Sequence, residues 1–153
     1  SGGIAVLENN KVLNIFDMPV MSEGKKNKRQ LNSAQLVTLI KENIKTNEEV
    51  TVVVEQVNAM PGQGVTSMFN FGQTFGAIKG VCAALELPIF FVRPSKWKKH
   101  FELINSSKDS SRTKAIEMYP TLSNNLAKKK DVNKSDAILI ARFYSETRLL
   151  DNN

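Results

Sequence analysis

The fold class of this chain follows from one stretch near its middle, Val50-Thr51-Val52-Val53-Val54-Glu55. The residues before Glu55 are all β-branched and nearly all apolar, which predicts a strand buried on both faces of a sheet. A carboxylate at the end of such a strand is costly unless it is paired or binds a metal. Glu55 is therefore a candidate functional residue. The alternative is a solvated carboxylate where a strand meets a loop.

The residues after Glu55 predict a loop over 58–64 and a long helix over about 66–86. Ligands of α/β proteins gather at the C-terminal ends of strands, which is where this loop begins. Gly72, Gly76 and Gly80 recur at intervals of four and share one helix face. A glycine inside a helix costs about 1 kcal/mol relative to alanine, so we expect close packing there, against this protein's own sheet or a second copy of the chain. Phe69 is either exposed beside the loop or part of the core.

The remaining segments predict an α/β sheet with an antiparallel edge. A hairpin is expected from residues 4–7 and 12–20, joined by an Asn-rich turn, and a further buried strand from 88–92. Lys25, Lys26, Lys28 and Arg29 are expected in a polar loop. Helices are predicted after a cap at Asn32 or Ser33, around Trp97 with its ring packed inward, within 106–119, and from Asp136 to about Leu149 with Ser135 as the cap.

The positive charge of the chain is concentrated in one third of the sequence. The 153 residues, which we interpret as a single domain (1–153), carry a net charge of +6. Residues 93–134 hold eleven Lys/Arg against four acids, whereas the rest holds ten against eleven. A lysine-rich solvated surface is one interpretation. The uneven placement favours a polyanionic partner, a nucleic acid, bound on one side.

Composition excludes several classes of protein. Hydrophobic residues make up 41% of the chain, which indicates a globular protein, and no apolar run reaches membrane-spanning length, so no membrane contact is expected. Cys82 is the single cysteine and lies in an apolar helical pattern, so we expect a core thiol in a reducing compartment. There is no Gly-rich phosphate loop, zinc-ligand spacing or Ser-His pair.

Two later acids, Asp131 and Asp136, stand at the start of the predicted last helix. Carboxylates from a strand end and a helix start can meet on one side of a sheet and bind Mg²⁺ or Mn²⁺. Two such ions roughly 4 Å apart can activate water for phosphodiester hydrolysis. Taken alone, Asp136 is better explained by the helix dipole than by a metal site. Together with Glu55 and the basic segment, these acids favour a metal site.

The chain resembles the RuvC Holliday-junction resolvases, and most of all the phage and organelle branch with a Met-Pro-Gly-Gln-Gly loop. The resemblance rests on Val53 to Gly64 with Ser67 to Gly72, on Arg93-Pro94-Ser95-Lys96-Trp97-Lys98-Lys99, and on Asp136-Ala137-Ile138-Leu139-Ile140-Ala141. It implies an RNase H-like fold, a mixed five-stranded sheet flanked by helices. It also implies a homodimer that nicks four-way DNA junctions with two Mg²⁺ or Mn²⁺ ions. The dimer contact is expected on the Gly72/Gly76/Gly80 helix.

The resemblance assigns Glu55 and Asp136 to the catalytic metal site. The further C-terminal ligand falls on Asp131, while bacterial members place it where this chain has Asn133. The resemblance also implies a set of DNA contacts: Gln56, Met60, Gln63, Phe69, Lys96, Lys98, Lys99, Lys108 and Arg112.

The family pattern begins with a strand ending in Asp-Pro-Gly, which would precede Ser1. Asp17 does not lie in a matching context. The resemblance therefore leads us to expect an N-terminally incomplete resolvase that lacks the first catalytic Asp and does not cut as it stands. A non-cleaving protein of the same fold that binds branched DNA is the alternative.

Overall fold

The computed structural model describes residues 2–23, 28–45 and 48–151, with helices and short strands in two compact units. The first unit comprises Ser1–Met18 and Val92–Asn153, and the second comprises Pro19–Phe91. The described strands form three two-stranded sheets, β1–β2, β3–β4 and β5–β6. The α/β class is thus confirmed, while the mixed five-stranded sheet is not. The single domain remains a prediction.

A hairpin opens the first unit. Strands β1 (Gly3–Glu8) and β2 (Lys11–Asp17) pair antiparallel from Gly3↔Asp17 to Glu8↔Lys11, with an irregularity between Val6 and Leu7. The two turn residues, Asn9 and Asn10, have φ of 51° and 65°. Asparagine tolerates this left-handed conformation, which a two-residue hairpin turn requires at both positions. The predicted Asn-rich turn is therefore confirmed.

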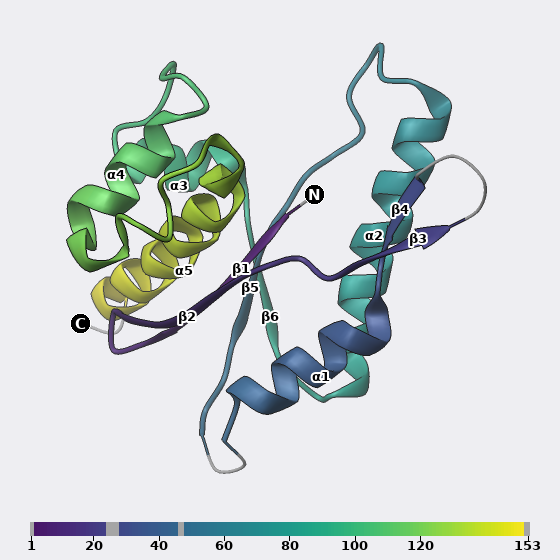
Figure 1. Cartoon of the computed structure of the whole chain (residues 1–153), viewed down its shortest axis with the longest axis horizontal. Coiled ribbons are helices and arrows are strands. Elements are labelled where there is room, and N and C mark those ends of the chain that lie inside the picture. The colour runs from purple at the N-terminus through teal and green to yellow at the C-terminus, as the bar shows by residue number, and fades with distance from the viewer. Residues whose placement is uncertain (1, 24–27, 46–47, 152–153) are drawn as a thin grey trace. The chain divides into compact units, whose positions relative to one another are not determined.

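One helix of the first unit, α5 (Val132–Asp151), packs on this hairpin, and two further helices pack on α5 (Figure 1). The two are α3 (Pro94–His100) and α4 (Ser110–Met118), with short 3-10 turns η1 (Pro120–Leu122) and η2 (Lys129–Asp131) between α4 and α5. The centre of the core consists of Ala115, Leu126 and Ile138, all fully buried. Trp97 is also buried, as predicted.

The start of α5 differs from the prediction. The helix begins at Val132 and not at Asp136, so Ser135 lies inside the helix and is not its cap. Its hydroxyl is buried and donates to the carbonyl of Asp131, four residues earlier, at 3.0 Å. The sequence misled us because a serine before an apolar run looks like a cap, whereas a buried serine can also bond within its own helix.

The second unit contains a hairpin where the sequence predicts the end of one long strand and a polar loop that includes Lys28 and Arg29. Its strands are β3 (Val20–Glu23) and β4 (Lys28–Leu31), paired antiparallel from Val20↔Leu31 to Glu23↔Lys28. The single strand over 12–20 was therefore wrong, because the chain leaves β2 at Asp17. Lys25 and Lys26 lie outside the described residues.

The rest of the second unit includes the strand and the loop that carry Glu55, a residue of the candidate site. Helix α1 (Ser33–Asn43) is capped by Asn32, whose side chain accepts from the Gln35 N–H at 3.1 Å. Strand β5 (Val52–Glu55) leads through a loop to α2 (Val65–Ala84), and β6 (Ile89–Val92) pairs with β5. All residues of β5 are half-buried, so the prediction of a strand buried on both faces was wrong. No described helix is long and apolar enough to span a membrane.

Candidate nucleic-acid interface

Glu55 is the last residue of β5, as the sequence predicted. Its side chain is half-buried, and the chain then runs through residues 56–64 to the start of α2. The carboxylate thus lies at the C-terminal end of a strand, next to a loop that leads into a helix. In α/β folds this is the usual position of a ligand-binding group. Gln56, the next residue, is half-buried as well.

The loop after Glu55 is held to the first turn of α2 by Gln63. The Gln63 side-chain oxygen accepts from the Met60 N–H at 3.3 Å, and its NH₂ group donates to the Ser67 hydroxyl at 3.2 Å. Gly62 has a φ of +85°, which side chains rarely adopt. Gln63 was predicted to contact DNA. That contact stays a prediction, and the hydrogen bonds add a role in shaping the loop.

Three apolar side chains at this loop and the first turn of α2 are strongly exposed. Val65 is 80% exposed, Phe69 68% and Met60 66%. Exposure of Phe69 answers the question that the sequence left open, since its core alternative is excluded. Val65 was missed, although its spacing of four from Phe69 places both on one helix face. Exposed apolar groups of this size commonly mark an interaction surface.

Helix α3 presents the predicted lysines around a buried ring. Pro94 occupies the first turn, where a missing N–H costs nothing, and Trp97 is buried. Lys96 and Lys99 are exposed, and the Lys98 ammonium lies 5.6 Å from the centre of the Trp97 ring. A cation over an indole face is held in place without losing its charge. The helix is thus a rigid carrier of three positive charges.

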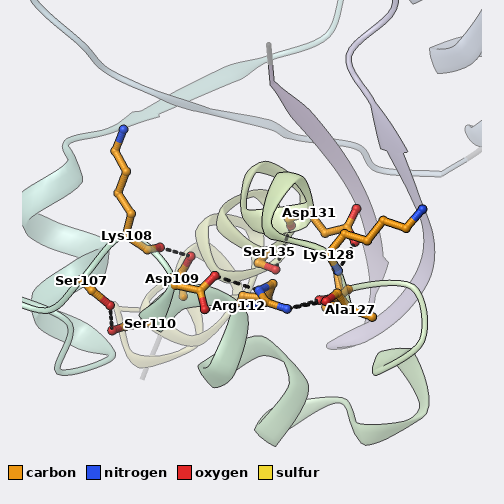
Figure 2. Close-up of polar contacts among 11 residues, drawn as sticks. Ser107, Lys108, Asp109, Ser110, Arg112, Ala127, Lys128, Asp131 and Ser135 are labelled. Atoms are coloured by element: carbon orange, nitrogen blue, oxygen red, sulfur yellow. Dashed lines mark hydrogen bonds and ion pairs between the residues drawn. The ribbon is translucent and has the colours of Figure 1, made fainter.

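Lys108 and Arg112 lie close together in the sequence but differ in their contacts (Figure 2). Lys108 is exposed, and its ammonium points away from the cluster of polar contacts. The Arg112 guanidinium donates to both Asp109 carboxylate oxygens, at 2.8 and 2.9 Å, and to the carbonyls of Leu126 and Ala127. The hydrogen bond lowers the pKa of Asp109 and raises that of Arg112. Arg112 therefore joins α4 to the loop before η2, and its contact with DNA stays a prediction.

Asp131 is buried, with 4% exposure, at the end of η2 where α5 begins. One carboxylate oxygen accepts from the Lys128 N–H at 2.8 Å (Figure 2), and the other lies 3.0 Å from the Lys134 ammonium. Burial would raise the pKa of Asp131, but these two partners together lower it. Both oxygens are thus engaged within the chain.

These contacts bear on whether Asp131 can bind a metal ion. The Lys134 ammonium is also 3.9 Å from Asp17, so a protein cation already lies between two carboxylates. Carboxylate oxygens suit Mg²⁺ in general, yet a ligand must offer an oxygen to the metal. Each carboxylate oxygen has two lone pairs, so one contact per oxygen leaves a lone pair for a metal ion, and the role of Asp131 as a ligand stays a prediction. Lys134 was missed because nothing in its sequence context distinguishes it from neighbouring lysines.

Asp136 lies in the first turns of α5 and is half-buried, as is Asn133. It belongs to the first unit, whereas Glu55 belongs to the second. Within either unit, the described residues include no group of three or more His, Cys, Asp or Glu that could hold a metal ion. By donor type Glu55 and Asp136 fit Mg²⁺ or Mn²⁺. Their role as ligands stays a prediction.

The single histidine has a structural partner that the sequence analysis did not find. His100 at the end of α3 lies 2.5 Å from a carboxylate oxygen of Glu146 on α5, and its ring packs edge-on against Phe143. Glu146 also accepts from Arg142 at 2.7 Å. Burial would raise the pKa of Glu146, and these partners lower it. The contact fastens the lysine-bearing helix α3 to α5.

No protein-family model and no curated protein sequence matches the chain. Solved structures do. A structure of Thermus thermophilus RuvC in complex with a Holliday junction substrate matches with a TM-score of 0.54 and 13% identity, over 95% of this chain and 87% of that one. Another Thermus thermophilus RuvC structure matches with a TM-score of 0.50 and 17% identity, over 84% and 86%. The fold of this chain is therefore similar to that of RuvC.

Proposed function

We propose that this chain acts on branched DNA as an endonuclease that resolves four-way junctions by paired nicks. The observation that carries the proposal is the fold similarity to RuvC, which extends over 95% of the chain. Glu55 supports it, because a carboxylate stands at the end of β5 where the sequence resemblance requires one. Helix α3 supports it with the two exposed lysines and half-buried Lys98.

The proposed DNA surface has two parts, one in each unit. In the first unit, Lys96, Lys98, Lys99 and Lys108 would contact phosphates, which positions DNA without reading its sequence. In the second unit, the exposed side chains Met60 and Phe69 would pack against unstacked or terminal bases at the branch. Aromatic and apolar groups stack on any base, so this contact selects shape and not sequence.

The proposed cofactor is Mg²⁺ or Mn²⁺. Glu55 and Asp136 would hold it, and it would supply an activated water for hydrolysis of the phosphodiester bond. Asp131 is the further ligand proposed, and its oxygens would be shared with the Lys128 N–H and the Lys134 ammonium.

We also propose a homodimer, with the Gly72/Gly76/Gly80 face of α2 as the contact. A Cβ placed on any of these glycines meets no atom within 4 Å, so this face does not pack against described residues of its own chain. The sequence left two partners open for this face, the protein's own sheet and a second copy of the chain. Among the described residues, the protein's own sheet does not contact it. Paired nicks on opposite strands of a junction require two active sites, which a dimer provides.

A non-cleaving protein that binds branched DNA is the second candidate. The ion pair between Asp131 and Lys134 favours it, since a carboxylate that a lysine already neutralises attracts a metal ion less strongly. The two candidates agree on the DNA surface. They differ only in metal-dependent chemistry.

The first test measures binding of a fluorescently labelled four-way junction and of a linear duplex of the same sequence, with EDTA present. Preference for the junction supports both candidates, and equal affinity contradicts both. Nicking is then measured with Mg²⁺ or Mn²⁺. The assay uses this chain and a version extended upstream by a strand ending in Asp-Pro-Gly, the arrangement of the resembled family. Nicking that disappears in Glu55→Gln supports the endonuclease, and binding without nicking in both versions supports the second candidate.

A further inference from the structure

The second unit has a groove where the β3–β4 hairpin lies beside α2 (Figure 1). Its volume is about 190 Å³, below the roughly 300–1,000 Å³ usual for small-molecule pockets. A groove of this size suits one group of a larger partner better than a whole small ligand. The sequence predicts a polar loop around Arg29, and no role was predicted for that segment.

Six of the nine residues that line the groove are polar, the other three are Met21, Leu31 and Ala77, and none of the nine is acidic. From α2 come residues spaced i, i+3 and i+4, which share one helix face. The hairpin and the first residue of α1 supply the opposite wall. The polar lining residues are Arg29, Gln30, Ser33, Asn70, Gln73 and Thr74.

This chemistry matches the backbone of a nucleic acid. Guanidinium, amide and hydroxyl groups are the side chains that contact phosphate and sugar in protein–DNA complexes. The charge of the two described strands agrees, since they contain Lys28 and Arg29 against the single acid Glu23. The only charged residue in the lining is Arg29, and with no acidic residue beside it the groove favours an anionic group such as a phosphate.

The groove also adjoins the surface already proposed for DNA. Gln73, which lines the groove, lies four residues after Phe69, which is 68% exposed, so the two share one face of α2. A DNA strand that packs against Phe69 would therefore pass the mouth of the groove without leaving the second unit.

We propose that this groove binds the sugar-phosphate backbone of one DNA arm, with Arg29 on a phosphate and the amides of Asn70 and Gln73 on neighbouring oxygens. This inference rests on the proposed action on branched DNA and adds a contact surface that the sequence resemblance does not include.

The test compares Arg29→Ala with Lys41→Ala by fluorescence anisotropy of a labelled junction over a series of salt concentrations. Lys41 is an exposed lysine on α1 that does not line the groove, so it controls for loss of one charge in the same unit. Arg29→Ala should weaken binding about five- to tenfold near 0.1 M salt and reduce the slope of log affinity against log salt by about 1. Lys41→Ala should change neither. Equal effects of the two variants would overturn the proposal that the groove binds DNA.

A second variant and a crosslink guard against a folding defect in Arg29→Ala. Gln73→Ala replaces an exposed helix residue and should weaken binding by about two- to tenfold, the effect of one lost hydrogen bond. A benzophenone attached at Asn70→Cys should crosslink to the DNA strand, and one at Lys41→Cys should not; Cys82, at 1% exposure, does not compete for the label. Crosslinking only to a second copy of the chain would overturn the proposal. If the wild-type chain bound no DNA at all, the proposed function itself would be contradicted, and the groove proposal, which rests on it, would be contradicted too.

Discussion

At the scale of single residues, Lys134 has the most informative position. Its side chain is 15% exposed, and its ammonium lies 3.0 Å from Asp131 and 3.9 Å from Asp17. Asp131 in turn accepts the Lys128 N–H and so closes the turn before α5. A carboxylate that caps a helix start and is neutralised by a lysine stabilises the fold.

Asp131→Asn should lower the free energy of unfolding by about 1.5–3 kcal/mol, because the amide can still accept from the Lys128 N–H but no longer gives the Lys134 ammonium a charged partner. Partners lower the pKa of Asp131 in the folded state, so its contribution is present above the unfolded pKa of about 4 and is lost as pH falls through the folded value. The difference between wild type and variant should therefore be largest near neutral pH and shrink in acid. Thermal unfolding at several pH values checks this, and a difference independent of pH would contradict the assignment.

Glu55→Gln should abolish nicking in any version of the chain that cuts, while leaving junction binding intact or tighter. The substitution keeps the size of the side chain and removes the charge that holds a metal, and it lessens repulsion of phosphate. Gel assays of nicking and anisotropy of binding measure the two effects. Glu42→Gln, on the exposed face of α1, is the matched control and should change neither. Near wild-type nicking by Glu55→Gln would reject Glu55 as a ligand.

Lys98→Ala and Lys108→Ala should each weaken binding to all DNA sequences alike, because a lysine contact to phosphate positions without specifying. Each should also reduce the salt slope by about 1. Lys114→Ala serves as the control, because the Lys114 ammonium lies 3.8 Å from Glu117 and so already has an acidic partner. Titration of a labelled junction at several salt concentrations distinguishes the variants. An unchanged slope for Lys98→Ala or Lys108→Ala would show that the lysine is merely solvated.

At the scale of elements, Gly3 decides how closely β1 approaches the start of α5. A Cβ on Gly3 would lie 2.6 Å from backbone atoms of Asn133 and Lys134, which is a clash with main chain. The contact brings β1 against the turn that Asp131 and Lys134 hold. Glycine is required at this position for space.

Gly3→Ala should destabilise the chain by about 1–3 kcal/mol, as overpacking against backbone commonly does. Gly2→Ala is the control one residue away, because its Cβ would meet only the Met18 side chain at 3.5 Å or more. Chemical denaturation of the two variants should separate them clearly. Equal stabilities would mean that β1 is not seated against α5 as described.

At the scale of the whole molecule, the open glycine face of α2 bears on assembly. Gly76→Leu should shift a dimer towards monomer, because a large side chain would separate two helices that meet at this face. Sedimentation or gel filtration at equal protein concentration measures the shift. Lys41→Leu adds a comparable side chain on α1 and controls for nonspecific association. An unchanged dimer in Gly76→Leu would place the contact on another surface.

Local signals made several elements predictable from the residues alone. Asn9-Asn10 favours a tight hairpin turn, Asn32 caps α1, and the pattern around Trp97 indicates a helix with one buried ring. These features depend on residues within a few positions of one another, so backbone preferences and side-chain spacing suffice. The position of Glu55 at a strand end belongs to the same class.

The remaining features depend on contacts between residues distant in the sequence. Arg112 finds its carbonyl partners 14 and 15 residues away, and His100 pairs with a residue 46 positions later, so their roles could not be read from their neighbours. The β3–β4 hairpin has strands of four residues with polar sequence, and packing beside α2 supports it more than intrinsic preference does. The sequence pattern predicted the turns and helices because the interactions that stabilise them join residues only a few positions apart. Which charges are exposed, and which hold the fold together, depended on burial and partners that exist only once the chain is packed.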